Sequence, residues 1–187
     1  MSIRELYNIP QDGKILLYVS NISVNKNQQQ MVDAYALLPE GIRNHTWALF
    51  CGRFSQDGSF ERAVKENPFV DHFVLCGSIE KRSIANYYKE ADGVVLLSVA
   101  EGFGLSLIEG MHFGIPCVMF KDMEAFEDIY NPCAVVPIEK RDNASVASAI
   151  EILLETSWDK TVIKSYSRKF NNDSMARNYL DVYNKLK

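Results

Sequence analysis

The chain has 187 residues, of which 47% are apolar and 24% are charged, and its formal net charge is −4. This composition excludes disordered and fibrous proteins and is typical of one globular domain with a sizeable core. No run reaches the about eighteen apolar residues of a membrane span, and residues 1–10 lack the apolar region of a signal peptide, so we expect a cytoplasmic protein.

The charge is unevenly distributed along the chain. Residues 159–187 carry seven Lys or Arg against three Asp or Glu, a balance of +4, which leaves −8 on the rest. Two interpretations stay open for this tail. It lies against anionic lipid at the inner face of the membrane or against an acidic partner domain, or it is an ordinary solvated helix face. We expect no nucleic-acid partner.

Short apolar runs rich in β-forming residues alternate with helical patterns. The expected strands are residues 14–20, 46–51, 72–76, 93–98, 116–120 and 134–138. Such near-continuous runs indicate strands that are covered on both faces. Amphipathic stripes between them predict helices over 28–38 and 81–91. The alternation predicts an α/β fold with a doubly wound, Rossmann-like parallel sheet of about six strands and helices on both faces, whose ligands bind at the carboxyl ends of the strands.

The end of the chain is expected to be helical. From Asn143 the apolar residues fall on a helical stripe, and a second stripe comprises Met175, Tyr179, Val182, Tyr183 and Leu186. The sequence contains no internal repeat, low-complexity tract or linker. We therefore predict one domain over residues 1–187.

The four cysteines do not form a metal-binding pattern. They contain no CxxC pair and no histidine at a metal-ligand offset, so we expect no metal site. Each adjoins an apolar run, which predicts buried, reduced thiols, and Cys51 and Cys76 each precede a glycine at a strand end, where they could lie close in space.

The most informative segment is SVAEGFGLSLIEGM at 98–111, which follows an expected strand and opens an expected helix. Gly102 and Gly104 would let the backbone approach a ligand closely. The N–H groups of 103–106 would then point from the helix N-terminus, where the dipole favours an anion such as a pyrophosphate. Glu109 lies about one turn inside the helix and leans toward its N-terminus, within reach of a ligand's diol.

Each piece of this segment has a structural explanation when taken alone, since the dipole favours an acidic first turn and a glycine after a strand makes a turn. The combination is more specific. Two glutamates eight positions apart around Gly-Phe-Gly-Leu, followed by Gly-Ile-Pro at 114–116, resemble the signature of the retaining GT-B glycosyltransferases of the "glycosyl transferases group 1" type, family four. Weaker similarities extend the resemblance over residues 3–187. They include Asp92, the segment 73–79, and Tyr183 and Leu186.

The resemblance implies a role for each residue of the motif. Glu101 would contact the hydroxyls of the donor sugar, and Gly102, Phe103, Gly104 and Leu105 would contact phosphates and sugar. Glu109 would contact the ribose. Ser78 and Ile79 would contact the nucleotide base through their backbone.

The family's phosphate clamp is an arginine after the first strand and a lysine about six residues later. Lys26 matches the lysine and would be catalytic together with Glu101, whereas Asn21 stands at the arginine position. Asn21 has no charge and no bidentate fork, so we expect weaker phosphate binding than in a typical member, or another cation in its place.

The resemblance also implies a partner domain and a reaction. Members transfer a sugar with retention and without a metal or other cofactor, from a UDP-, GDP- or ADP-sugar. Their acceptor lies on an N-terminal domain, which we do not find in residues 1–187. Two alternatives stay open: a degenerate nucleotide-sugar-binding module with a scaffold or sensing role, and an unrelated flavodoxin-like domain.

Overall fold

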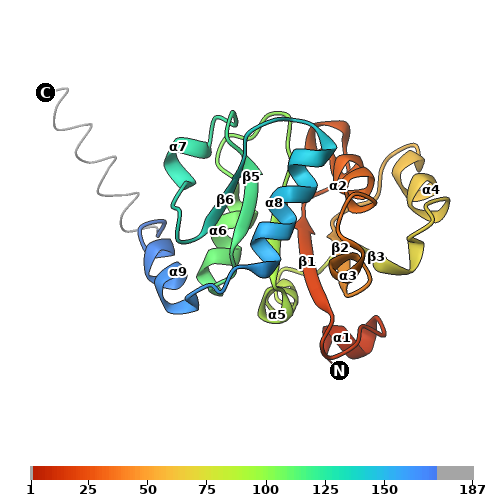
Figure 1. The fold of residues 1–187 in the computed structure, drawn as a ribbon, viewed down its shortest axis with the longest axis horizontal. Helices are drawn as coiled ribbons and strands as arrows, with labels where there is room; N and C mark the ends of the chain where they lie inside the picture. Colours follow the sequence, from red (N-terminus) through yellow and green to blue (C-terminus); the bar gives the residue numbers. More distant parts are fainter. Residues whose placement is uncertain (1, 172–187) are drawn as a thin grey trace, which may run out of the picture.

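The computed structural model describes residues 2–171, and its centre is a six-stranded parallel sheet in the order β3-β2-β1-β4-β5-β6 (Figure 1). All six predicted strands are present, and the prediction of a doubly wound α/β fold is confirmed. Their bounds are β1 Lys14–Val19, β2 Thr46–Cys51, β3 Phe73–Gly77, β4 Gly93–Leu96, β5 Cys117–Phe120 and β6 Val135–Ile138.

Helices cover both faces of this sheet. α2 (Gln28–Tyr35) and α8 (Asn143–Glu155) pack against each other on one face, and α6 (Leu105–His112) packs on β4 from the other, behind the sheet in Figure 1. The remaining helices are α1 Ile3–Leu6, α3 Glu40–Arg43, α4 Ser59–Lys65, α5 Ile84–Glu90, α7 Phe126–Ile129 and α9 Lys160–Ser167, with 3₁₀ turns η1 Val24–Lys26 and η2 Val70–His72.

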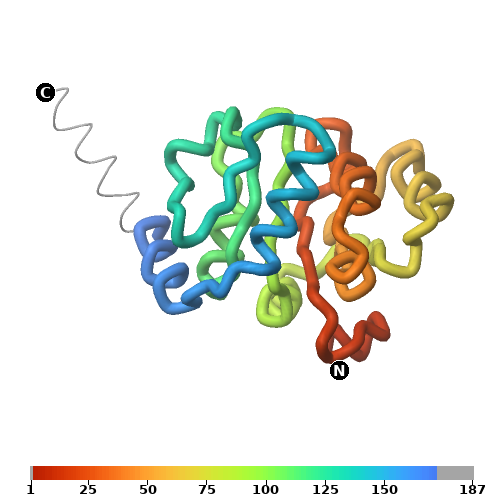
Figure 2. The backbone as a smooth tube through the Cα atoms, in the orientation of Figure 1, coloured from red at the N-terminus to blue at the C-terminus, as the bar shows by residue number. Residues whose placement is uncertain are grey.

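The order of the strands reverses between β1 and β4. The chain builds β1, β2 and β3 outward in one direction, then crosses back through α5 to place β4 on the other side of β1. Leu16 of β1 is paired with Gly93 of β4, so segments far apart in the sequence run side by side (Figure 2). In folds of this type, ligands bind outside the carboxyl ends of the strands at the point where the strand order reverses.

The loops after β1, β2 and β3 are bonded to one another at the carboxyl edge. The Ser20 N–H donates to the Cys51 carbonyl and the Gly52 N–H to the Gly77 carbonyl, both at 2.9 Å. A Cβ atom at Gly52 would lie 1.9 Å from the Ser20 carbonyl oxygen, so only glycine permits this approach. The loop that begins at Ser20 is therefore held tightly against its neighbour.

The thiol predictions are confirmed in part. Cys51 and Cys117 are buried, but Cys133 is exposed because it lies in the turn before β6, so its predicted burial is wrong. Cys76 is only half-buried, so its predicted burial is met in part. It lies beside Cys51, as expected, near the β-bulge between β2 and β3, and both thiols are free.

The helical prediction after β6 is confirmed for α8, and the basic tail begins with α9, whose Ile163 is buried. The second predicted stripe, Met175 to Leu186, lies outside the described residues. Between residues 2 and 171, no helix is both long and apolar enough to cross a bilayer.

Candidate functional site

Two loops meet at the point where the strand order reverses. The first follows β1 and contains residues 20–27, and the second follows β4 and contains residues 97–104. The side chain of Asn25 joins them, because its amide donates to the Ala100 carbonyl and its oxygen accepts the Ala100 N–H, both at 3.1 Å. The Val99 N–H also donates to the Asn25 carbonyl at 2.8 Å. The two loops are thus one bonded unit.

Lys26 and Glu101 form an ion pair across this unit. Lys26 Nζ lies 2.5 Å from Glu101 Oε2, and the side chains are 27% and 16% exposed. The other carboxylate oxygen accepts the Gly104 N–H at 3.2 Å, and the Ser98 hydroxyl lies 3.4 Å from Oε2. Burial would raise the pKa of Glu101, but the bonds from Lys26 and Gly104 outweigh it and hold that pKa below its ordinary value. Glu101 is therefore held as a carboxylate.

Tyr18 holds the backbone beneath this ion pair. Its hydroxyl donates to the Lys26 carbonyl and accepts the Leu97 N–H at 2.7 Å, so it touches both loops. The side chain is 1% exposed, and burial raises the pKa of the phenol, which keeps it a neutral donor. The Ser23 hydroxyl caps the 3₁₀ turn that ends at Lys26. Sequence reasoning missed Tyr18, because within a strand it looks like one more core residue.

The N-terminus of α6 opens into the same place. Gly104 has a φ of +67°, and a Cβ there would lie 2.9 Å from Ile129, so the chain needs glycine at this turn. Its N–H is taken by Glu101, but within residues 2–171 no acceptor is found for the N–H groups of Leu105 and Ser106. These two amides stand at the positive end of the helix dipole, a position that favours an anion in general. A Cβ at Gly102 would meet no protein atom, so its proposed role toward a ligand stays a prediction.

Glu109 is exposed and held in place by Tyr88. The buried Tyr88 hydroxyl donates to Glu109 Oε2 at 2.8 Å and to the Ser106 carbonyl at 3.3 Å. Burial first, and then the Glu109 charge, raises the pKa of Tyr88, so the phenol remains a donor. Tyr88 lies within 81–91, where the sequence predicts an amphipathic helix, and no local pattern indicates this second role.

Asn21 stabilises the loops at the carboxyl edge of the sheet through two hydrogen bonds. Its side-chain oxygen accepts the Arg53 N–H at 3.1 Å, and its carbonyl accepts from the buried Gln28 side chain at 3.0 Å. It thus joins the loops after β1 and β2. Ser78 and Ile79 follow β3, two strands from β1, so the structure does not bring them into contact with the ion pair. Phe103 is 43% exposed and Leu105 64% exposed, beside the free amides.

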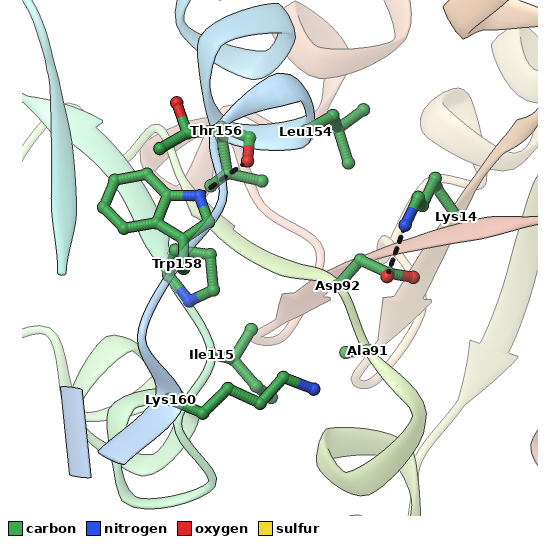
Figure 3. A pocket seen from close by; sticks show the side chains of 10 residues that line it. Lys14, Ala91, Asp92, Ile115, Leu154, Thr156, Trp158 and Lys160 are labelled. Carbon is green, nitrogen blue, oxygen red and sulfur yellow. Dashed lines mark hydrogen bonds and ion pairs between the residues drawn. The ribbon is translucent and has the colours of Figure 1, made fainter. Parts of the chain in front are cut away.

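Two cavities lie at opposite edges of the sheet. A groove of about 780 Å³ lies between residues 22–29 and 55–63 at the carboxyl edge. It borders the loop that carries Lys26, but neither Lys26 nor Glu101 lines it. A smaller pocket of about 150 Å³ lies at the amino edge, where the Lys14–Asp92 pair lies on the side opposite Trp158 (Figure 3). No cluster of side chains suited to a metal ion occurs in the described part of the chain.

Comparison with known proteins places this geometry in a family context. A protein-family model described as "Glycosyl transferases group 1" matches residues 2–170. A D-inositol 3-phosphate glycosyltransferase from Xylanimonas cellulosilytica is 25% identical over 97% of this chain and 45% of its own length. An N-acetyl-alpha-D-glucosaminyl L-malate synthase from Bacillus anthracis is 25% identical over 97% of this chain and 48% of its own length.

Solved structures give the same picture of the fold. HepE from Anabaena, in complex with UDP and glucose, matches 98% of this chain and 51% of its own with a TM-score of 0.81 at 16% identity. Sucrose-phosphate synthase from Thermosynechococcus elongatus matches 98% of this chain and 48% of its own with a TM-score of 0.80 at 26% identity. The chain spans about half the length of the relatives it matches.

Proposed function

The chain belongs to the glycosyl transferases group 1 family, and from this membership we propose that it is the donor-binding, C-terminal half of a GT-B glycosyltransferase. It binds a nucleoside diphosphate sugar. Together with an N-terminal domain that holds the acceptor, it transfers the sugar, with retention, to a hydroxyl group in glycan or glycolipid biosynthesis. The reaction takes place in the cytoplasm, with access to the inner face of the membrane.

The observation that carries this proposal is the Lys26–Glu101 pair beside the free amides of α6. A diphosphate needs positive charge, which the Lys26 ammonium and the amides of Leu105 and Ser106 can supply. A carboxylate accepts hydrogen bonds from sugar hydroxyls, and Glu101 is ionised and adjacent. The pair therefore offers matching groups to both ends of a sugar diphosphate.

The same groups fit the chemistry of the departing nucleotide. When the bond from sugar to phosphate breaks, negative charge grows on the diphosphate oxygens. Fixed donors that already point at this charge stabilise the transition state more than water does. Ser23 and Tyr18 hold the backbone of Lys26, Glu101 holds its ammonium, and the helix holds the amides. This arrangement requires no metal ion.

The proposal that the chain is one half of an enzyme rests on its family and on its length relative to the relatives it matches. The curated relatives carry about as many residues again beyond the matched region. The donor is a UDP-, GDP- or ADP-sugar, and the likeness in fold to HepE, whose structure holds UDP and glucose, supports a nucleotide-sugar donor.

Asn21 favours one second function, a nucleotide-sugar-binding module without transfer activity. Its side-chain oxygen is bonded to the Arg53 amide, and the clamp arginine implied by the family resemblance is missing from this position. A chain that keeps the Lys26–Glu101 pair but lacks this charge could bind a nucleotide in a scaffold or sensor.

Calorimetric titration of the chain with UDP, GDP and ADP, without added metal, tests the donor-binding proposal. We expect one of them to bind with a Kd of about 0.1 to 1 mM, or about −4 to −5.5 kcal/mol, because half of the cleft is supplied by the other domain. Absence of binding by all three at several times that concentration would refute it.

A further inference from the structure

Arg141 joins three loops at the carboxyl edge of the sheet. It follows β6, and its guanidinium donates to the carbonyls of Ser98 at 3.1 Å and Val99 at 3.4 Å, in the loop after β4. Its third nitrogen donates to Asp122 at 2.8 Å, in the loop after β5. The guanidinium also lies 4.4 Å from the centre of the Phe120 ring. An acceptor for each of the three nitrogens and a ring beside the guanidinium together fix the plane of this group.

The loop that Arg141 holds is the one that carries Glu101. Ser98 is fully buried, its carbonyl accepts from Arg141, and its hydroxyl contacts the Glu101 carboxylate. Glu101 lies three positions after Ser98 in the chain. A displacement of the anchor therefore moves the carboxylate relative to both Lys26 and the Gly104 amide.

A second path leads from Arg141 to Lys26. The Arg141 carbonyl accepts from the Gln30 side chain at 2.9 Å, and the Gln30 oxygen accepts from Asn27 at 2.6 Å. Asn27 follows Lys26 in the chain and has a φ of +53°, so it turns the backbone directly after the ammonium-bearing residue. Arg141 is thus linked by hydrogen bonds to the loop of Glu101 and, through Gln30 and Asn27, to the loop of Lys26, but it does not contact the ion pair itself.

We propose that Arg141 is a positioning residue of the diphosphate-binding site, which sets the geometry between Lys26 and Glu101 by holding the loops on either side of them. The identity of the ligand, a nucleoside diphosphate, rests on the proposed function, whereas the bonds that Arg141 makes do not depend on it. Arg141 lies outside the motif at 98–111 and keeps the site formed before the donor binds.

The chain offers a matched control in the same two loops. Lys121, after β5, pairs with Glu139, after β6, at 3.1 Å, and both side chains are more than half exposed. This pair crosses between the same strands as Arg141 and Asp122 but has no bond to the loop after β4. Loss of Lys121 therefore removes an ion pair between β5 and β6 and leaves the Glu101 loop untouched.

The test compares the wild-type chain of 187 residues with its variants Arg141→Gln, Arg141→Lys and Lys121→Gln. Calorimetry measures binding of UDP, GDP and ADP at a temperature where all variants are folded. We expect Arg141→Gln to weaken the tightest of the three by about tenfold. Arg141→Lys should weaken it nearly as much, because an ammonium cannot bond two carbonyls and Asp122 in one plane. Lys121→Gln should bind like the wild type.

A second measurement is independent of any nucleotide. The titration of the Glu101 carboxyl group is followed by NMR, with Glu101→Gln for assignment. The titratable groups that interact with Glu101 in residues 2–171 are Lys26 and Tyr18. In Arg141→Gln the pKa of Glu101 should rise toward its ordinary value, because the Lys26 and Gly104 contacts loosen; in Lys121→Gln it should not change.

Three results would overturn the inference. The first is wild-type affinity in Arg141→Gln, and the second is wild-type affinity in Arg141→Lys, which would show that only the positive charge at position 141 matters. The third is an unchanged Glu101 titration in Arg141→Gln. If the wild type binds none of the three nucleotides, the proposed function fails, and the Glu101 titration alone decides the role of Arg141. Arg141→Lys serves as the folded variant if Arg141→Gln is unstable.

Discussion

The ammonium of Lys26 lies 2.5 Å from the carboxylate of Glu101, although 75 positions separate them in the sequence. The contact exists because β1 and β4 are neighbours in the sheet and their following loops are bonded through Asn25. Each charge compensates the other in a partly buried place, so removal of one would leave the other without its partner. A sugar diphosphate would offer Lys26 and Glu101 new partners at the same time.

Replacement of Lys26 by alanine should weaken nucleotide binding by about 1.5 to 3 kcal/mol, the cost of one charge-assisted hydrogen bond. Lys14→Ala is the matched control, because Lys14 also pairs with a carboxylate, Asp92, but at the amino edge of the sheet (Figure 3). Calorimetry with the best of the three nucleotides measures both variants. Similar losses in the two variants would show that Lys26 acts through general charge and not through contact.

Glu109→Gln should weaken nucleotide binding by about 1.5 to 3 kcal/mol if the carboxylate accepts from the ribose hydroxyls. The fold should survive, because the Tyr88 hydroxyl can donate to the amide oxygen as well. His112→Ala lies on the same helix, where His112 Nδ1 bonds the Ile108 carbonyl at 2.9 Å, and should leave affinity unchanged. Equal losses at positions 109 and 112 would place the ribose elsewhere.

Asn21→Arg should tighten nucleotide binding several-fold, because it adds a forked cation beside the diphosphate. The substitution also removes the bond from Asn21 to the Arg53 amide, so Asn21→Ala is needed as the control that loses the bond without gaining the charge. The difference in Kd between the two variants isolates the charge. If Asn21→Arg binds no tighter than Asn21→Ala, position 21 does not face the phosphates.

Acid should destabilise the wild type more than the Glu101→Gln variant. The pKa of Glu101 in the folded chain is lowered, although burial opposes this, by its bonds to Lys26 and Gly104. A carboxyl group with a lowered folded pKa stabilises the protein above its unfolded pKa, and this stabilisation is lost as the pH falls through the folded pKa. Urea unfolding at a series of acidic pH values measures it. Parallel curves for the two proteins would contradict the assigned pKa direction.

The strands and the helix α6 could be predicted from the sequence because their signals are local. Each strand is a short apolar run, and α6 begins at Leu105, after the glycine that the motif places there. The family could be recognised for the same reason. Two glutamates and two glycines at fixed spacing lie within one segment, so no knowledge of the fold was needed.

The groups that support the site could not be predicted in this way. Tyr18, Asn25 and Arg141 act by bonding the backbone of a loop that is distant in sequence. Backbone amides and carbonyls are the same at every residue, so such contacts leave no pattern of residue types. The short helix α4 was also missed.

Sugar transfer by the isolated chain and by the chain joined to an N-terminal acceptor domain is the most direct test of the central claim. Released nucleotide and glycosylated product are assayed in both with the same donor and hydroxyl acceptor. Alignment of the two reactants supplies about 7 to 11 kcal/mol of the reduction in barrier, so we expect no acceptor glycosylation by the chain alone and retaining transfer by the assembly. Transfer by the isolated chain at the rate of the assembly, or none by a folded assembly, would contradict the half-enzyme account.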